Sequence, residues 1–395
     1  MSTFADFAEA ASRSATKVAP VQVPEYRRFA VLGGGPDARL LAALCLADGR
    51  EVTLFSAYGA ELSVLRASSG IALRGAGPVG TYHVDRGAGP SVALTAELDA
   101  AVAGADVIFL TGPVHKQRTY AMVLADHLSD GQVLVIAPGR SLGALEAAWM
   151  LRIGGCTADV TIVEAQGLPY WISEQGAVLN LSTAAPVAAA TLPSGRTAVL
   201  EGLMPILPNL QAVGSVVASG FADGSACVEF PALLMSGPAI GSGAIAVPMG
   251  ASPLAENQNF ASLIGAEQSR LIAGLAGERA AVASHFGVRG LRDAKAIETA
   301  YAGEIKGAGT RPVPDAKLAK QMLRDGVIGS LVPLVSAAEM ADIEVPMTRA
   351  MITLASSVLG ADVAAAGRKL ETIGISGADL ADVRKAMDAI ATGAR

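Results

Sequence analysis

A glycine-rich turn near the N-terminus is the first segment whose residue types and spacing suit a chemical function. It has the pattern Gly-x-Gly-x-x-Ala, and its residues are Gly33, Gly34, Gly35, Pro36, Asp37 and Ala38. The glycines let the backbone turn tightly and approach a pyrophosphate, and the small third residue lets a helix pack against a sheet. An apolar run, 28–32, precedes the turn and a helical stretch, 39–48, follows it, as a dinucleotide-binding loop requires. We predict that the turn binds a pyrophosphate at a helix N-terminus; a tight turn without a ligand is the alternative.

The end of the next predicted strand, 51–55, bears on the kind of dinucleotide. An NAD site usually has an acid there, which binds the ribose 2′-hydroxyl. This chain has Ser56 instead, with Glu51 before the strand and Glu61 five residues beyond Ser56. Without a carboxylate at the strand tip, a 2′-phosphate is not repelled and Ser56 can donate to it. The sequence therefore favours NADP as the cofactor, with NAD as the alternative. A purely structural role for Ser56, as the cap of the next helix, is also open.

Polar and turn residues also follow three later predicted strands, 106–110, 132–136 and 160–163. These residues are Thr111, Gly112, Pro113 and His115 after the first strand, Pro138 and Gly139 after the second, and Glu164 after the third. Parallel strands end at one edge of the sheet, where ligands bind in such folds, so we predict that these residues border the nicotinamide and the substrate. His115 is expected on the first turn of a helix, where it either contacts the cofactor or is a surface histidine.

The order of strands and helices predicts an α/β protein. Residues 25–225 are expected to form a doubly wound parallel Rossmann sheet, with a small antiparallel excursion at 71–92 and an N-terminal extension, 1–24, that includes a short helix at 4–17. Residues 226–395 are expected to form a mostly α-helical domain. Its predicted helices are 259–286, 291–302, 315–323, 331–340, 347–359 and 378–391.

Composition excludes several classes of protein. The 395 residues are 51% hydrophobic and 17% charged, with a net charge of −6; this excludes a disordered chain and argues against nucleic-acid binding. Three scattered cysteines form no CxxC pair, so neither a zinc site nor a disulfide scaffold is expected. Prolines and glycines interrupt the longest uncharged stretch, 230–255, which argues against a membrane span. A cytoplasmic protein is expected, and the apolar stretch 351–359 is interpreted as core or as the face of a homodimer.

Three segments in combination resemble the opine dehydrogenases. They are 109–115 (FLTGPVH), 128–140 (LSDGQVLVIAPGR) and 162–170 (IVEAQGLPY), and the resemblance covers roughly residues 28–360. It implies a two-domain oxidoreductase acting on CH–NH bonds. Such enzymes join the amino group of an amino acid or amine to a 2-oxo acid and reduce the imine with NAD(P)H, or run in reverse, so the implied partners are these small molecules and the cofactor.

One departure from the family concerns proton transfer. The family has a catalytic histidine in a His-Pro context at the start of the helical domain, whereas the matching stretch here, 226–237, has none. By this resemblance Glu229 lies at or next to the vacant place, Asp325 is the partner acid, and Lys320 holds a substrate carboxylate. An ion-paired or solvated Glu229 at a domain junction is the alternative. Two other functions stay open: an enzyme of changed chemistry (a 2-oxo acid or 2-hydroxy acid reductase, or an amine oxidiser) and a non-catalytic dinucleotide sensor.

Overall fold

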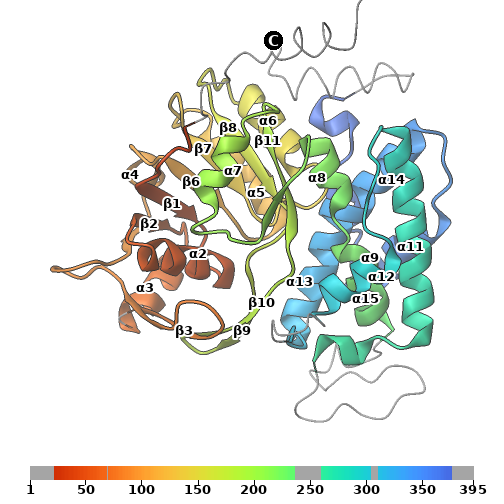
Figure 1. Ribbon diagram of the computed structural model, residues 1–395, viewed down its shortest axis with the longest axis horizontal. Helices are drawn as coiled ribbons and strands as arrows, with labels where there is room; N and C mark the ends of the chain where they lie inside the picture. The colour runs from red at the N-terminus through yellow and green to blue at the C-terminus, as the bar shows by residue number, and fades with distance from the viewer. Residues whose placement is uncertain (1–21, 69, 236–258, 304–309, 376–395) are drawn as a thin grey trace, which may run out of the picture.

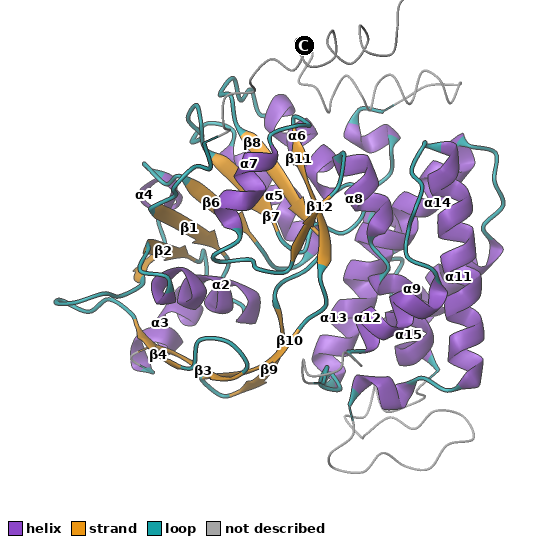
Figure 2. Cartoon of the chain, in the orientation of Figure 1, coloured by secondary structure: helices purple, strands orange, loops and turns teal. Residues whose placement is uncertain are grey.

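The chain has an eight-stranded main sheet with the strand order β12-β11-β8-β7-β6-β1-β2-β5 (Figures 1 and 2). A computed structural model describes residues 22–68, 70–235, 259–303 and 310–375. All neighbouring strands are parallel except β11, which runs antiparallel to β8. The strands are β1 (Arg28–Leu32), β2 (Glu51–Phe55), β5 (Ala93–Thr95), β6 (Val107–Leu110), β7 (Val133–Ile136), β8 (Thr161–Ala165), β11 (Val187–Leu192) and β12 (Leu210–Ala212).

Helices cover both faces of this sheet, so its central strands are buried on both sides, as parallel strands usually are. Along β1, Leu32 packs in the cluster that holds α5, α6 and α8, whereas Val31 packs in the cluster that holds α2 and α7. This confirms the doubly wound fold. The helices are α2 (Pro36–Ala47), α3 (Gly59–Ala67), α4 (Leu98–Val102), α5 (Val114–Leu124), α6 (Gly143–Ile153), α7 (Thr197–Leu203) and α8 (Val216–Ala222).

A second, four-stranded sheet with the order β4-β3-β10-β9 lies against α2 (Figure 2). Its strands are β3 (Gly70–Gly75), β4 (Gly80–His83), β9 (Tyr170–Gln175) and β10 (Val178–Thr183). The antiparallel pair β3–β4 confirms the predicted excursion. The pair β9–β10 was not predicted. An ion pair between Arg39 of α2 and Glu174 of β9 joins the two parts.

The C-terminal part of the described chain is helical, and α9 lies at its centre, in contact with α11, α12, α13 and α15. The helices are α9 (Ser225–Leu234), η1 (Phe260–Leu263), α11 (Ala266–His285), α12 (Ala294–Ala302), α13 (Ala316–Gly326), η2 (Val327–Leu331), α14 (Val332–Met340), α15 (Pro346–Leu359), η3 (Ala364–Ala366) and η4 (Glu371–Ile373). The predicted helices between 259 and 359 are confirmed. Those at 4–17 and 378–391 lie outside the described residues.

The sheet and the helical part share one apolar core, because buried residues of α11 and α14 pack in the same cluster as those of α5, α6 and α8. Figure 1 shows the two parts side by side. Helix α15 buries Met351 and Ala355, while Leu354 and Val358 are about half exposed. The stretch 351–359 is therefore core on one side, and a homodimer stays a prediction.

No single helix in the described ranges is both long and apolar enough to cross a membrane. The pair Pro346–Leu359 and Ala364–Ile373 meets those criteria jointly, but it is bent by 115°.

Candidate active site

The glycine turn leads from β1 into α2 and leaves open space above the helix N-terminus. Gly33 has φ +134°, and a Cβ there would lie 3.1 Å from the hydroxyl of Thr111, so the turn packs directly on the loop after β6. Gly35 precedes α2 and no side chain caps the helix. A Cβ on Gly35 would meet nothing within 4 Å. The first N–H groups of α2 thus face a space in which a pyrophosphate fits.

The tip of β2 holds a carboxylate after all. The Ser56 hydroxyl donates to Glu61 Oε2 at 2.5 Å, and a Cβ on Gly34 would lie 1.9 Å from the same oxygen. Glu61 therefore reaches back from α3 to the space between β2 and the glycine turn. The premise of the NADP prediction, that no carboxylate stands here, is wrong. Ser56 does not cap α3 either, since its Oγ accepts from Tyr58 N at 3.1 Å and α3 has no side-chain cap.

The loops after β6 and β7 are tied together by a residue that the sequence did not single out. Gln117 of α5 is 3% exposed, and its Nε2 donates to the carbonyls of Gly112 at 3.2 Å and Pro138 at 3.0 Å. Thr111 is buried beside them and His115 is exposed on the first turn of α5. Helix α5 begins at Val114, after Pro113 at its N-cap, so the prediction that His115 lies on the first turn of a helix is confirmed.

Glu164 lies beneath this rim, and both of its carboxylate oxygens accept hydrogen bonds from the chain itself. It is fully buried and accepts from Ala144 N at 2.9 Å, the Ser219 hydroxyl at 2.6 Å and Gln166 Nε2 at 3.0 Å. Burial raises the pKa of Glu164 to about 7. A Cβ on Gly139 would lie 2.5 Å from Glu164 Cγ. This side chain supports the loop after β7 from below, and its contact with the cofactor stays a prediction.

Asp325 brings the helical part to the same edge of the sheet. Its Oδ1 accepts from Val114 N at 3.2 Å, so a carboxylate from α13 caps the N-terminus of α5. Burial raises the pKa of Asp325, although Arg140, the Val114 N–H and His115 act against the shift. Burial and the nearby Asp325 raise the pKa of Asp37, in the glycine turn, to about 6, while Arg140 lowers it. Asp37, Arg140 and Asp325 thus form one electrostatic cluster built from three segments.

Glu229 is an ion-paired carboxylate rather than a free acid. It is 3% exposed and pairs with Arg311 at 2.7 Å and with Arg140 at 3.3 Å. Burial raises the pKa of Glu229, but the two guanidinium groups outweigh burial and the net pKa is lowered. A group that stays ionised is poorly suited to proton transfer near neutral pH. The alternative reading of Glu229, an ion pair at the domain junction, describes its geometry.

Two arginines, and not Lys320, lie at this junction. Lys320 is exposed on α13, whereas its neighbour Gln321 bonds Asp325. Arg311 is 5% exposed and its guanidinium lies between the rings of Trp171, at 4.2 Å, and Phe260, at 4.1 Å. Arg311 could not be predicted as a site residue, because its partner Glu229 is 82 positions away along the chain.

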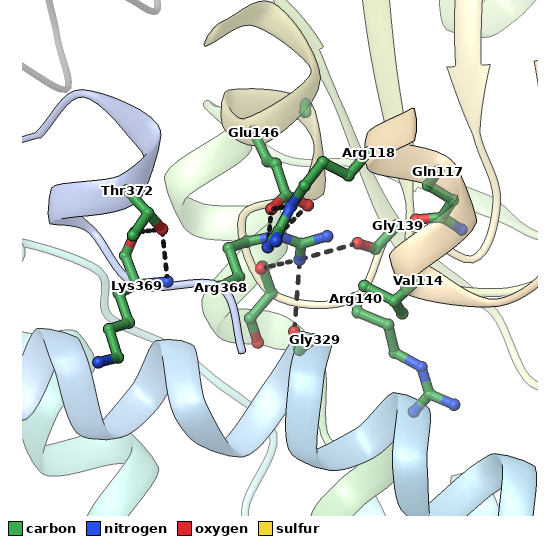
Figure 3. Close-up of polar contacts among 12 residues, drawn as sticks. Val114, Gln117, Arg118, Gly139, Arg140, Glu146, Gly329, Arg368, Lys369 and Thr372 are labelled. Carbon is green, nitrogen blue, oxygen red and sulfur yellow. Dashed lines mark hydrogen bonds and ion pairs between the residues drawn. The ribbon is translucent and has the colours of Figure 1, made fainter. Parts of the chain in front are cut away.

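A third buried arginine fixes the loop after β7 from the C-terminal side (Figure 3). Arg368 is 1% exposed; its Nε donates to Glu146 Oε2 at 2.9 Å and its Nη1 contacts the carbonyls of Ser141, Gly139 and Gly329. Arg118 of α5 also pairs with Glu146, at 2.6 Å. Figure 3 shows Arg140 extending from this loop away from Arg368. The cluster therefore holds the loop from which Arg140 reaches the site.

Comparison with known proteins places this arrangement among related folds. No protein-family model matches the chain. An opine dehydrogenase of Arthrobacter sp. strain 1C is 25% identical over 379 residues, which cover 92% of this chain and 99% of that protein. The chain resembles the opine dehydrogenases. An octopine dehydrogenase structure with NADH and pyruvate has a TM-score of 0.64 at 19% identity, covering 93% of this chain and 98% of that one. Yersinopine dehydrogenase with NADP⁺ has a TM-score of 0.57 at 12% identity, covering 93% and 99%.

The opine dehydrogenase-like chain has four histidines, and one of them lies beside the cluster. His115 interacts electrostatically with Asp325. The others lie elsewhere: His83 in β4, His127 near Asp99 at 3.4 Å, and His285 at the end of α11. In the middle of α9, within the stretch where the resemblance implies a histidine, Phe230 and Pro231 follow Glu229 and both are buried.

Proposed function

We propose that the chain is an NAD(P)-dependent oxidoreductase that joins an amino acid or amine to a 2-oxo acid by reduction, or oxidises the product. The observation that carries this proposal is that three features meet at one edge of the sheet. They are the open N-terminus of α2 at Gly35, the carboxyls of Asp37 and Asp325, whose pKa values burial raises, and the guanidinium of Arg140. The similarity to opine dehydrogenases over 92% of the chain supports the reaction class.

The residues of the sheet edge would hold the cofactor. The N–H groups at the start of α2 bind the pyrophosphate, since a helix N-terminus favours an anion. Thr111, Gly112 and Pro113 border the nicotinamide together with Pro138 and Gly139, because these two loops face each other across Gln117. When bound, NADH or NADPH supplies the hydride.

The chain's own residues would supply the proton and hold the substrate. Asp325 retains a proton more readily than an exposed carboxyl, since it is buried, and Asp37 is coupled to it. A protonated carboxyl at this place donates to the nitrogen or oxygen that gains negative charge as hydride arrives. Among the described residues, the contacts of Arg140 with Ser225 and Glu229 both use Nη1. The rest of the guanidinium is left to bind a substrate carboxylate.

A hydride-transfer screen tests the proposal. Oxidation of NADH and of NADPH is followed with the purified chain and a panel of amines and amino acids crossed with 2-oxo acids. Turnover that needs both reactants is expected. Turnover with the oxo acid alone would indicate a simple reductase, and cofactor binding without turnover would indicate a sensor; either result would overturn the reductive condensation.

Asp325→Asn, run in the same screen, tests the proton donor. It is expected to lower kcat by roughly 10²–10⁴-fold, the usual range for a lost acid–base group. Asp126→Asn is the matched control, because Asp126 is exposed after α5, and it should leave kcat unchanged. An active Asp325→Asn variant with an unaltered pH profile would remove Asp325 from the mechanism.

A further inference from the structure

We propose that Glu61 makes the site selective for NAD over NADP by occupying the place next to the adenosine 2′-position. The inference rests on the proposed function for the presence of a nicotinamide dinucleotide. It concerns a residue that lies five positions after the strand tip, on a helix, where the sequence pattern alone assigns no role.

The geometry brings the Glu61 carboxylate next to Gly34, on the side of the glycine turn that would face the adenosine ribose of the cofactor. Glu61 lies in the first turn of α3 and its Oε2 meets both the Ser56 hydroxyl, at 2.5 Å, and the space next to Gly34. Ser56 is 1% exposed directly after β2. In dinucleotide-binding βαβ units an acid at this strand tip bonds the ribose 2′-hydroxyl. Here the acid arrives from the following helix and Ser56 holds it in place.

Gly34 is required for this arrangement. Any Cβ at position 34 would lie 1.9 Å from Glu61 Oε2 and 2.6 Å from its Cδ, so a side chain would displace the carboxylate. The middle glycine of the turn thus makes room for Glu61, while Gly35 leaves open space above the helix N-terminus. The two glycines serve different parts of the cofactor.

The charges around Glu61 disfavour a 2′-phosphate. Arg66, on the same helix, is paired with Asp85 at 2.8 Å, and Arg39 of α2 is paired with Glu174. Both guanidinium groups thus already have an acidic partner.

Lys116 is the cation to be tested on this side, because its Nζ lies over the Tyr58 ring at 4.4 Å from the centroid. Tyr58 is 52% exposed, so Lys116 stands at the solvent side of the position and acts there as a screened point charge. The Glu61 carboxylate would accept a hydrogen bond from the ribose 2′-hydroxyl of NAD and repel the 2′-phosphate of NADP. Attraction and repulsion would then both favour NAD over NADP.

Direct binding of NADH and NADPH to the purified full chain tests the inference without relying on turnover. Affinities are measured by titration calorimetry for the wild type, Glu61→Gln and Glu51→Gln. The wild type is expected to bind NADH at least about tenfold more tightly than NADPH, because the contact between the Glu61 carboxylate and the 2′-phosphate of NADPH is repulsive and costs at least about that much affinity. Glu61→Gln keeps an acceptor for Ser56, so it should fold, and it should reduce this ratio by about tenfold or more. Glu51→Gln, at the exposed start of β2, should leave the ratio unchanged.

The outcomes separate this inference from the proposed function. Binding of both dinucleotides with a ratio that Glu61→Gln does not change, or tighter binding of NADPH by the wild type, would overturn the role of Glu61 alone. Absence of binding for both dinucleotides would overturn the proposed function and this inference with it. Lys116→Gln is measured in parallel. If this variant loses NADPH affinity by a larger factor than Glu61→Gln gains it, the result would also count against selection by Glu61.

Discussion

Replacing Glu229 by glutamine should destabilise the fold much more than it affects the chemistry. The change keeps the volume and one acceptor but removes the charge that faces two buried guanidinium groups. Glu229 contacts Arg311 at 2.7 Å and Arg140 at 3.3 Å. Breaking a buried ion pair by removing one partner costs about 3–5 kcal/mol, because the remaining charge is left uncompensated.

The surroundings of the two arginines place the cost at the low end of that range. Arg140 keeps Asp223 and Asp325 as nearby counter-charges. Arg311 keeps a hydrogen bond from Nη1 to the carbonyl of Tyr301 at 2.6 Å and its contacts with two aromatic rings. We expect Glu229→Gln to lower the free energy of unfolding by about 3 kcal/mol.

Urea unfolding at pH 7, followed by tryptophan fluorescence and by circular dichroism, measures this loss. Glu229→Gln is compared with Arg311→Met and with the double variant. The double variant should lose less than the sum of the two single variants, by about 2 kcal/mol, because residues in direct contact couple. Glu344→Gln, on an exposed loop, is the control and should change stability by less than about 0.5 kcal/mol.

Two results would refute the reasoning. A loss below about 1 kcal/mol would place Glu229 in the class of exposed ion pairs, against the buried pair described above. A stable variant whose kcat falls by about 10²-fold or more, as for a lost acid–base group, would instead restore the prediction that Glu229 replaces the missing histidine.

Three further changes test the support of the loop after β7. Gly139→Ala places a methyl group 2.5 Å from Glu164 Cγ, so it should cost about 1–3 kcal/mol and raise KM; an unchanged midpoint of thermal unfolding would contradict this. Burial raises the pKa of Glu164 to about 7, so the folded state holds the proton more tightly and stability should fall by about 3 kcal/mol as pH rises from about 4.5 to above 7. Urea unfolding at pH 5 and pH 8 should show a smaller difference in Glu164→Gln, and equal differences in the two proteins would count against a buried neutral acid. Arg368→Met leaves Glu146 with Arg118 alone and should cost about 3 kcal/mol while lowering kcat; full activity at normal stability would show that the loop needs no such anchor.

Much of the sheet could be predicted because its signals are local. The runs at 28–32 and 51–55 form β1 and β2 with the predicted bounds, since continuous apolar stretches next to turn residues are typical of buried parallel strands. The pair β9–β10 was missed because Tyr170–Gln175 has no buried residue and so no clear alternation of polar and apolar positions. The contact between Asp325 and the first residue of α5 could not be predicted either, because Val114 and Asp325 are 211 positions apart.

The candidate site could likewise be predicted from the sequence only in part. Parallel topology alone brings the strand ends together, so the glycine turn, Thr111 and Pro138 could be placed on one edge from the sequence. Pairing between distant side chains leaves no such pattern: Glu229 and Arg311 are 82 positions apart, and Glu146 and Arg368 are 222 apart. The role of each carboxylate in the site depends on such pairing, so residue type and position were not enough to assign it.

On the proposed function, the charges around Arg140 offer a proton donor in place of the histidine that the resemblance implies. Glu229 is committed to Arg311 as well as to Arg140, and three further carboxyls, Asp223, Asp325 and Asp37, interact with the positive charge of Arg140. Asp37 and Asp325 each raise the energy of the other when both are ionised; Asp325 raises the pKa of Asp37. Neighbouring carboxyls that outnumber their counter-charges tend to retain a proton among them near neutral pH. On the proposed function, a carboxyl at the domain junction therefore provides the acid, and the buried Glu229 holds the two arginines in place by its ion pairs.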